Sequence, residues 1–182
     1  MNINLVTDRL FLVGLSGGGK SSVAQAVATK LGWTTHDSDM EIAAQDGRSI
    51  KRIFAEDGED AFRTIEHDVL VRLSGHSRSV IAVGGGAMAE ATTRKHLLRH
   101  GLVAWLQVSP SVAAARLRTR LALEPRPMLG SNPEQSLSDL MRSRESAYCK
   151  AHIYIQTDRK SIEEVAASLV TELHTAQLSQ PV

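Results

Sequence analysis

Residues Gly14 to Ser21 read GLSGGGKS and fill the pattern G-x-x-x-x-G-K-[ST], which is typical of a phosphate-binding loop. Consecutive glycines let the backbone wrap a phosphate chain without side-chain clashes and turn N–H groups toward negative charge. The pattern places Lys20 at the β- and γ-phosphates and the Ser21 hydroxyl on Mg²⁺. The apolar run Leu10–Val13 before it and a helical pattern after it provide the strand and helix that such a loop joins.

Two carboxylates, Asp37 and Asp39, follow the next apolar stretch. On an extended backbone, side chains at i and i+2 project to the same side. Asp37 would then suit a water-mediated contact with Mg²⁺, and Asp39 would suit a proton or hydrogen bond from a substrate hydroxyl. The segment is equally typical of a helix N-cap, so the residues alone leave both interpretations open.

A glycine triplet, Gly84 to Gly86, follows an apolar strand pattern and gives a ligand access to the backbone, although a turn without function would look the same. Between this triplet and the carboxylates lies Arg63, whose planar fork suits a carboxylate. Phe54 and Phe62 suit the walls of an apolar ring site.

Apolar runs of strand length recur along the chain, separated by stretches with helical spacing. This alternation predicts an α/β fold with a parallel sheet covered on both faces. Ser161 and Glu164 predict a capping box before the last helix. The expected strands are about 10–13, 33–36, 80–83, 102–108 and 153–155.

Length and composition predict one domain over residues 1–182, since 182 residues with 42% hydrophobic content can bury one substantial core. A net charge of +1 offers no global attraction for nucleic acid or an anionic membrane, so we expect small-molecule partners.

The single cysteine, Cys149, excludes an internal disulfide and suits a reducing compartment. We find no secretory leader or membrane-spanning apolar run, and therefore expect a cytoplasmic protein. The seven histidines lack metal-ligand spacing.

The ordered set GLSGGGKS, DSD, GRSI, IF, GEDAFRTIE, VGGGA, RPML and R-x-x-x-Y resembles the shikimate kinase family over about residues 8 to 175. The resemblance implies a monomeric enzyme that uses ATP to phosphorylate the 3-hydroxyl of shikimate, on the route to chorismate and aromatic amino acids. It also implies a three-layer α/β/α P-loop kinase of the nucleoside-monophosphate-kinase type with a five-stranded parallel sheet. A helical substrate-binding segment would occupy about 37–72 and a lid about 119–135.

The resemblance also implies roles for individual residues. Since the segment before RPML is one residue longer than expected, either Arg118 or Arg120 would pack on adenine. The implied catalytic residues are Lys20, Asp39 and Arg126; the ATP-binding residues are Gly17, Gly18, Gly19, Lys20, Ser21, Ser22, Arg118 and Arg126; the shikimate-binding residues are Asp39, Arg63, Glu66, Gly84, Gly85, Gly86 and Arg144; and the Mg²⁺-binding residues are Ser21 and Asp37.

Two alternatives compete with this interpretation. Another P-loop kinase, for gluconate or a nucleotide, would share the first motif but is not expected to combine the Phe-Arg pair, the triple glycine and the late arginine. A ligand sensor built on the same fold would usually carry a DNA-binding segment, and about nine residues before the first strand leave no room for a helix-turn-helix. Because the catalytic residue types are all present, we expect a kinase.

Overall fold

The computed structural model describes residues 8–121 and 132–178, in which strands and helices alternate. The strands are β1 (Arg9–Val13), β2 (Thr34–Asp37), β3 (Ser79–Ala82), β4 (Leu102–Gln107) and β5 (Ile153–Gln156). The helices are α1 (Lys20–Leu31), α2 (Ser38–Asp46), α3 (Ile50–Leu73), α4 (Ala91–His100), α5 (Pro110–Leu121), α6 (Pro133–Tyr148) and α7 (Ile162–Leu178), with a 3₁₀ turn η1 (Ala87–Ala89).

The five strands form one parallel sheet in the order β2-β3-β1-β4-β5, which confirms the predicted five-stranded parallel sheet. The central strand β1 pairs with β3 and β4, with Leu10 opposite both Val80 and Leu102. In a parallel sheet all carboxyl ends lie at one edge, so the loops that follow β1, β2 and β3 meet there. This edge is where ligands bind in open α/β sheets.

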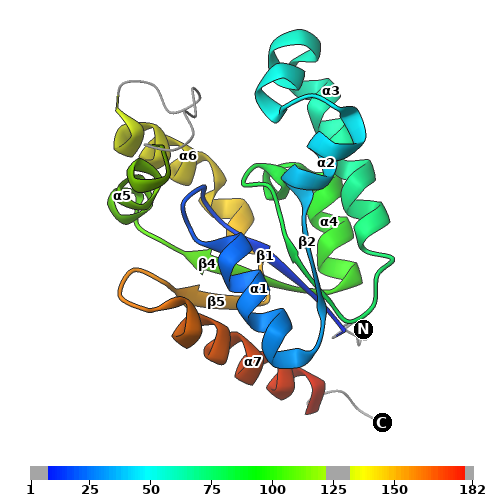
Figure 1. The fold of residues 1–182 in the computed structure, drawn as a ribbon, viewed down its shortest axis with the longest axis vertical. Coiled ribbons are helices and arrows are strands. Elements are labelled where there is room, and N and C mark those ends of the chain that lie inside the picture. Colours follow the sequence, from blue (N-terminus) through cyan, green and yellow to red (C-terminus); the bar gives the residue numbers. More distant parts are fainter. Residues whose placement is uncertain (1–7, 122–131, 179–182) are drawn as a thin grey trace.

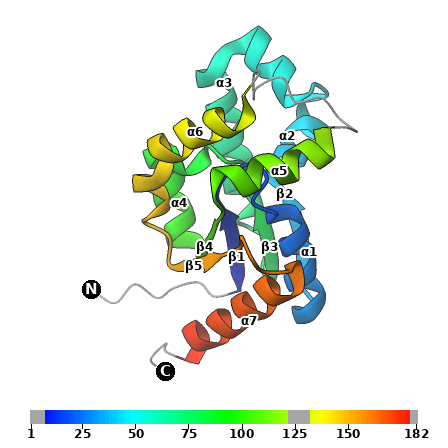
Figure 2. The same cartoon turned by 90° about the vertical axis from the view of Figure 1, so that its left-hand side faces the viewer.

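Alternating side chains of β1 divide the core into two halves. Leu10 and Leu12 pack with α1 and α7 on one face, whereas Phe11 and Val13 pack with α3, α4 and α6 on the other. Figure 2 shows the sheet lying between α7 and α1 on one side and α4 on the other. The three-layer α/β/α arrangement predicted from the sequence is therefore confirmed.

A smaller core joins α5 and α6 to the loop that follows β1. Leu15 from this loop packs with Ala114 and Leu117 of α5 and with Leu137 of α6. In Figure 1, α5 and α6 lie beyond the carboxyl edge of the sheet on one side, and α2 with the first half of α3 lies beyond it on the other. The loop after β1 thus lies between two helical segments.

Helix α3 is divided by Gly58, which has φ 84° and ψ 176°. The part of α3 that carries Arg63 and Glu66 is therefore the second half of a longer element. Ahead of the break, the Arg48 guanidinium bonds Asp46 at 2.6 Å and also Asp57, which ties the end of α2 to the first half of α3. A network of this kind holds two short helices together more effectively than isolated surface pairs.

Helix α7 begins with the capping box that the sequence predicts. The Ser161 N–H donates to Glu164 Oε2 at 2.8 Å, and the Glu164 N–H donates to Ser161 Oγ at 3.2 Å. These bonds satisfy two N–H groups that the first turn of a helix cannot pair internally. Among the described residues, none of the helices combines the length and apolar composition needed to cross a membrane.

Three histidine rings from α3 and α4 contact one another. His96 stacks on His100 with ring centroids 4.0 Å apart and meets the edge of His67 at 5.9 Å. Its Nε2 lies 3.0 Å from the Ser74 hydroxyl. Burial, helped by the neighbouring rings, lowers the pKa of His96 from its ordinary 6.5 to about 4.

This histidine makes stability dependent on pH. In the unfolded chain His96 takes up a proton near pH 6.5, but in the folded protein only near pH 4, so the unfolded state holds more protons between these values. The free energy of unfolding should therefore fall as the pH is lowered from about 6.5 to about 4. Urea unfolding at pH 7 and pH 5 should show a smaller fall in His96→Gln. The exposed His174→Gln should behave as wild type, and an equal fall in all three proteins would contradict this assignment.

Candidate active site

The loop after β1 passes so close to its neighbours that one position requires glycine. Gly17 has φ 83°, and a Cβ added there would lie 2.6 Å from the Ala113 carbonyl oxygen. A larger residue would clash with α5 and strain the backbone. The loop therefore lies directly against α5 and leads into the first turn of α1.

The first turn of α1 begins with Lys20 and contains no acidic residue. Lys20 begins the helix, and its ammonium donates to the carbonyl oxygens of Gly14 at 2.9 Å and Leu15 at 3.0 Å. The free N–H groups of a helix N-terminus attract anions. The Lys20 ammonium and the N–H groups at the start of α1 together form a site suited to a phosphate chain.

Asp37 uses its two carboxylate oxygens for different contacts, and one of these is the helix cap that the sequence left open. Its Oδ1 caps α2 by accepting from the Asp39 N–H at 3.1 Å and the Met40 N–H at 3.4 Å. Its Oδ2 accepts from the Ser21 hydroxyl at 2.6 Å. The carboxylate and the hydroxyl are hard oxygen donors of the kind that Mg²⁺ prefers, so this pair fits a magnesium ion.

Of the two interpretations that the sequence left open, the structure shows the helix N-cap and not the extended segment. Asp37 ends β2, and because it caps α2, the chain is already helical at Ser38. Asp39 therefore lies in the first helical turn. Its carboxylate reaches Gly84, where an added Cβ would lie 2.8 Å from Asp39 Oδ1.

The loop after β3 passes between charged side chains. A Cβ at Gly84 would also lie 2.5 Å from Glu66 Oε1, and a Cβ at Gly86 would overlap the Arg63 guanidinium. A Cβ at Gly85 would lie 3.4 Å from Arg144 Nη1. The structure thus brings together four predicted side chains, from α2, α3 and α6, around a loop that has none. The site residues placed around it are Asp39, Arg63, Glu66 and Arg144.

Arg63 and Glu66 form an ion pair beneath this loop. Arg63 Nη1 donates to Glu66 Oε2 at 2.6 Å, and the Glu66 side chain is 2% exposed. Burial raises the pKa of the Glu66 carboxyl, and the positive charge of Arg63 opposes this rise. The Arg63 Cζ lies 5.9 and 5.3 Å from the ring centroids of Phe54 and Phe62, so the two rings flank the guanidinium, and their role as walls of an apolar ring site stays a prediction.

Two contacts of the loop were not predicted. The Tyr148 hydroxyl donates to the Gly85 carbonyl at 2.5 Å, and the Ser38 hydroxyl accepts from the Gly84 N–H at 2.9 Å. The Tyr148 ring packs on Trp105 with centroids 5.5 Å apart. Tyr148 had a sequence signal in the R-x-x-x-Y motif, whereas Ser38 had only its place between two aspartates.

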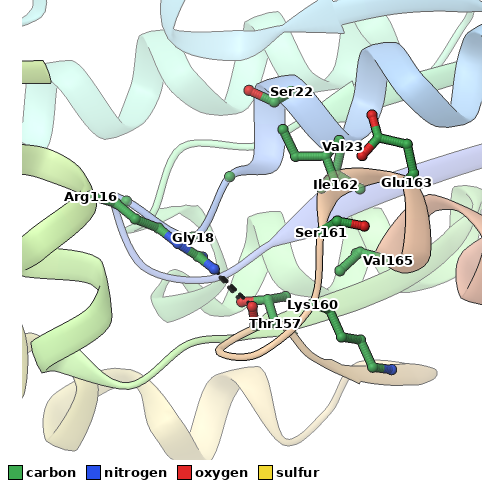
Figure 3. Close-up of a pocket in the computed structure, with 12 residues that line it drawn as sticks. Gly18, Ser22, Val23, Arg116, Thr157, Lys160, Ser161, Ile162, Glu163 and Val165 are labelled. Carbon is green, nitrogen blue, oxygen red and sulfur yellow. Dashed lines mark hydrogen bonds between the residues drawn. The ribbon is translucent and has the colours of Figure 1, made fainter. Parts of the chain in front are cut away.

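A pocket of about 520 Å³ opens beside the loop after β1 (Figure 3). Arg116 Nη2 donates to the Thr157 carbonyl at 2.7 Å and so joins α5 to the loop before α7. This contact of Arg116 was not predicted from the sequence. The lining residues are Gly17, Gly18, Gly19, Ser22, Val23, Arg116, Thr157, Lys160, Ser161, Ile162, Glu163 and Val165.

Three arginines predicted to act near the nucleotide are not placed in this pocket. Arg118 is exposed on α5 and is absent from the lining residues. The Arg120 side chain and the whole of Arg126 lie outside the described residues, as does most of the predicted lid. Their roles stay predictions.

Comparisons with known proteins agree over nearly the whole chain. A family model described as shikimate kinase matches residues 16–174. A shikimate kinase of Symbiobacterium thermophilum is 38% identical over 166 residues, which cover 90% of this chain and 95% of the relative. A second, from Moorella thermoacetica, is 36% identical over 160 residues, with 88% and 91% covered.

Solved structures with a similar fold include shikimate kinases and another kinase. The shikimate kinase from Acinetobacter baumannii in complex with shikimate has a TM-score of 0.88 at 34% identity and covers 97% of both chains. A gluconokinase from Sinorhizobium meliloti 1021 has a TM-score of 0.64 at 19% identity, which is a likeness of fold alone.

Proposed function

The chain belongs to the shikimate kinase family and is a kinase that phosphorylates shikimate in aromatic biosynthesis, and we propose how the site described above performs this transfer. The observation that supports the proposal is the convergence of Asp39, Glu66, Arg63 and Arg144 on a side-chain-free glycine loop. The nearest part of this loop, at Gly85, approaches the phosphate loop, because an added Cβ would lie 3.4 Å from the Gly14 carbonyl oxygen. An acceptor bound at the glycine triplet would therefore lie next to a phosphate chain.

The phosphate side of the site stabilises charge on the transferring group. The N–H groups at the start of α1 bind the phosphate chain of ATP, and Lys20 leaves its loop carbonyls to contact the β- and γ-phosphates. Ser21 and Asp37 would hold Mg²⁺, which supplies positive charge to the phosphate oxygens when bound. Phosphoryl transfer needs little covalent assistance, so positioning and charge provide most of the catalysis.

The acceptor side recognises a small anionic triol. Arg63 and Arg144 bind the carboxylate of shikimate, since a guanidinium fork pairs with a carboxylate through two hydrogen bonds. In the structure Arg63 Nη2 is held by Glu59 at 2.9 Å, and Glu59 is 65% exposed. A surface pair of this kind is weak, so the shikimate carboxylate can replace Glu59 at little cost.

Glu66 keeps the opposite edge of Arg63 occupied and so fixes the direction of its fork. Asp39 accepts a hydrogen bond from the 3-hydroxyl and draws its proton away as the oxygen attacks phosphorus. The oxygen of the 3-hydroxyl then lies between the carboxylate of Asp39 and the phosphate loop. This arrangement orients the acceptor before transfer.

The nucleotide base would occupy the pocket lined by Arg116 and Thr157. Gly18 and Ser22 line this pocket and none of the glycine triplet does, so the base would lie beside the phosphate loop and apart from the acceptor. Arg118 would contribute from the exposed side of α5, and Arg126 would close over the phosphates from the predicted lid. Closure excludes water, which would otherwise compete with shikimate for the phosphoryl group.

The proposal is tested by ADP release from Mg·ATP in a coupled assay with shikimate, gluconate or no acceptor. Shikimate alone should stimulate release strongly, and Lys20→Ala should lose the stimulation by a hundredfold or more, because one preorganised charge is worth about that much. Binding of shikimate without ADP release would favour the sensor alternative. Stimulation by gluconate instead would require new assignments for both arginines.

Asp39→Asn should lose most turnover while it binds ATP nearly as wild type, because the amide cannot take the proton of the 3-hydroxyl. The turnover number and the ATP dissociation constant measured on the same preparation separate the two effects. Turnover equal to wild type would remove Asp39 from the mechanism.

Arg63→Ala should raise the KM for shikimate by about tenfold to a hundredfold, because a charge-assisted hydrogen bond is worth about 1.5–3 kcal/mol. The KM for ATP should change much less. Arg72→Ala is a matched control on the same helix, since Arg72 is half-exposed and pairs only with Glu41 among the ion pairs of the described residues. A larger effect on ATP than on shikimate would contradict the assignment of Arg63.

A further inference from the structure

The glycine loop after β3 is held by two side-chain hydroxyls that the proposed mechanism does not use. Ser38 Oγ accepts from the Gly84 N–H at 2.9 Å, and the Tyr148 hydroxyl donates to the Gly85 carbonyl. Ser38 and Tyr148 are both completely buried. One hydroxyl comes from α2 on one side of the loop and the other from α6 on the other side.

The two side-chain bonds lie just after the last backbone hydrogen bond between β3 and β1. The Val83 N–H still donates to the Leu12 carbonyl at 3.0 Å, but the next N–H, that of Gly84, lies beyond the last bond between β3 and β1. Glycine places few limits on its own backbone angles, so without further contacts several loop positions would have similar energies. A buried N–H or carbonyl without a partner would also cost about 1–3 kcal/mol.

The remaining bonds of the loop leave two donors for a ligand. The Gly84 and Gly86 carbonyls accept from Ala87 at 3.1 Å and Ala89 at 2.9 Å in the turn that follows. Among the described residues, the N–H groups of Gly85 and Gly86 make no such bond. The position of these donors therefore depends on what holds the backbone on either side of them.

We infer that Ser38 and Tyr148 are positioning residues that hold the backbone of the glycine loop in the position in which it binds shikimate. Ser38 lies immediately before Asp39 in the first turn of α2, so its bond to Gly84 also sets the distance between that carboxylate and the loop. Tyr148 lies one helical turn after Arg144 on α6, so its bond to Gly85 does the same for the guanidinium. The inference rests on the proposed function, because it assigns the loop to shikimate.

The chemistry of the two hydroxyls differs in a way that the variants can use. Ser38 serves as an acceptor, so Thr keeps the bond and Ala removes it. Tyr148 serves as a donor, and burial raises its pKa, which keeps the proton on the hydroxyl. Tyr148→Phe removes only this oxygen and keeps the ring on Trp105.

Steady-state kinetics with shikimate and ATP varied separately test the inference. Ser38→Ala and Tyr148→Phe should each raise the KM for shikimate about fivefold to a hundredfold, because each leaves a buried loop group unpaired. The KM for ATP should change less than about twofold, since neither Ser38 nor Tyr148 lines the nucleotide pocket. Ser38→Thr should restore the KM for shikimate to within about threefold of wild type, because the acceptor oxygen returns.

Tyr154→Phe is the matched control for the tyrosine. Tyr154 lies on β5, and its hydroxyl donates to the Cys149 carbonyl at the end of α6 at 2.8 Å and not to the glycine loop, so both KM values should stay at wild type. Unchanged kinetics in both Ser38→Ala and Tyr148→Phe would overturn the inference. Equal losses for shikimate and ATP, together with a lowered Tm, would also overturn it, since they indicate a general structural role.

Amide hydrogen exchange of the ligand-free protein separates this inference from the proposed function. The Gly84 N–H should exchange about tenfold faster or more in Ser38→Ala, whereas the Val83 N–H, held by β1, should not change. If wild type fails to phosphorylate shikimate but Gly84 responds in this way, the proposed function fails and the loop anchor stands. If Gly84 exchange is unchanged, the inference fails whatever the activity.

Discussion

The site depends on a stretch of backbone that has no side chains at the point where four charged groups converge. A methyl group at Gly84 would lie 2.5 Å from Glu66 and 2.8 Å from Asp39, so even alanine would push two carboxylates apart. Charged side chains can gather there only because the loop leaves them room. The space that they share is also the space that an acceptor needs, so glycine serves both packing and binding.

The buried pair of Arg63 and Glu66 explains how this charge is tolerated inside the protein. An isolated buried carboxylate would be strongly disfavoured, and the guanidinium at 2.6 Å offsets that penalty. Such a pair adds little net stability compared with apolar packing, but it fixes the direction of both groups. Its value here is orientation, because the other edge of Arg63 is held only by the exposed Glu59 and can exchange partners.

Features with local signals could be predicted from the sequence, and features set by packing between distant segments could not. The strands, the phosphate loop and the capping box at Ser161 depend on neighbouring residues, so their patterns were sufficient. The cap made by Asp37 competed with an extended alternative of similar local quality, so the sequence alone left open whether Asp39 lies on the strand or in the helix. Nothing near Arg116 in the chain indicates that it meets Thr157, which lies 41 positions later. Ser38 and Tyr148 acquire their roles only when α2 and α6 approach the same loop.

The position of Trp105 has a practical consequence for spectroscopy. The chain has two tryptophans, and Trp105 packs on Tyr148 while its Cδ1 would lie 3.3 Å from a Cβ at Gly14, so it borders both loops of the site. Trp33 instead packs on the opposite face of the sheet with the α1 and α7 core. Movement of either loop on ligand binding would change the surroundings of Trp105 but not those of Trp33. Intrinsic tryptophan fluorescence is therefore a natural probe of site occupancy in this chain, without an attached label.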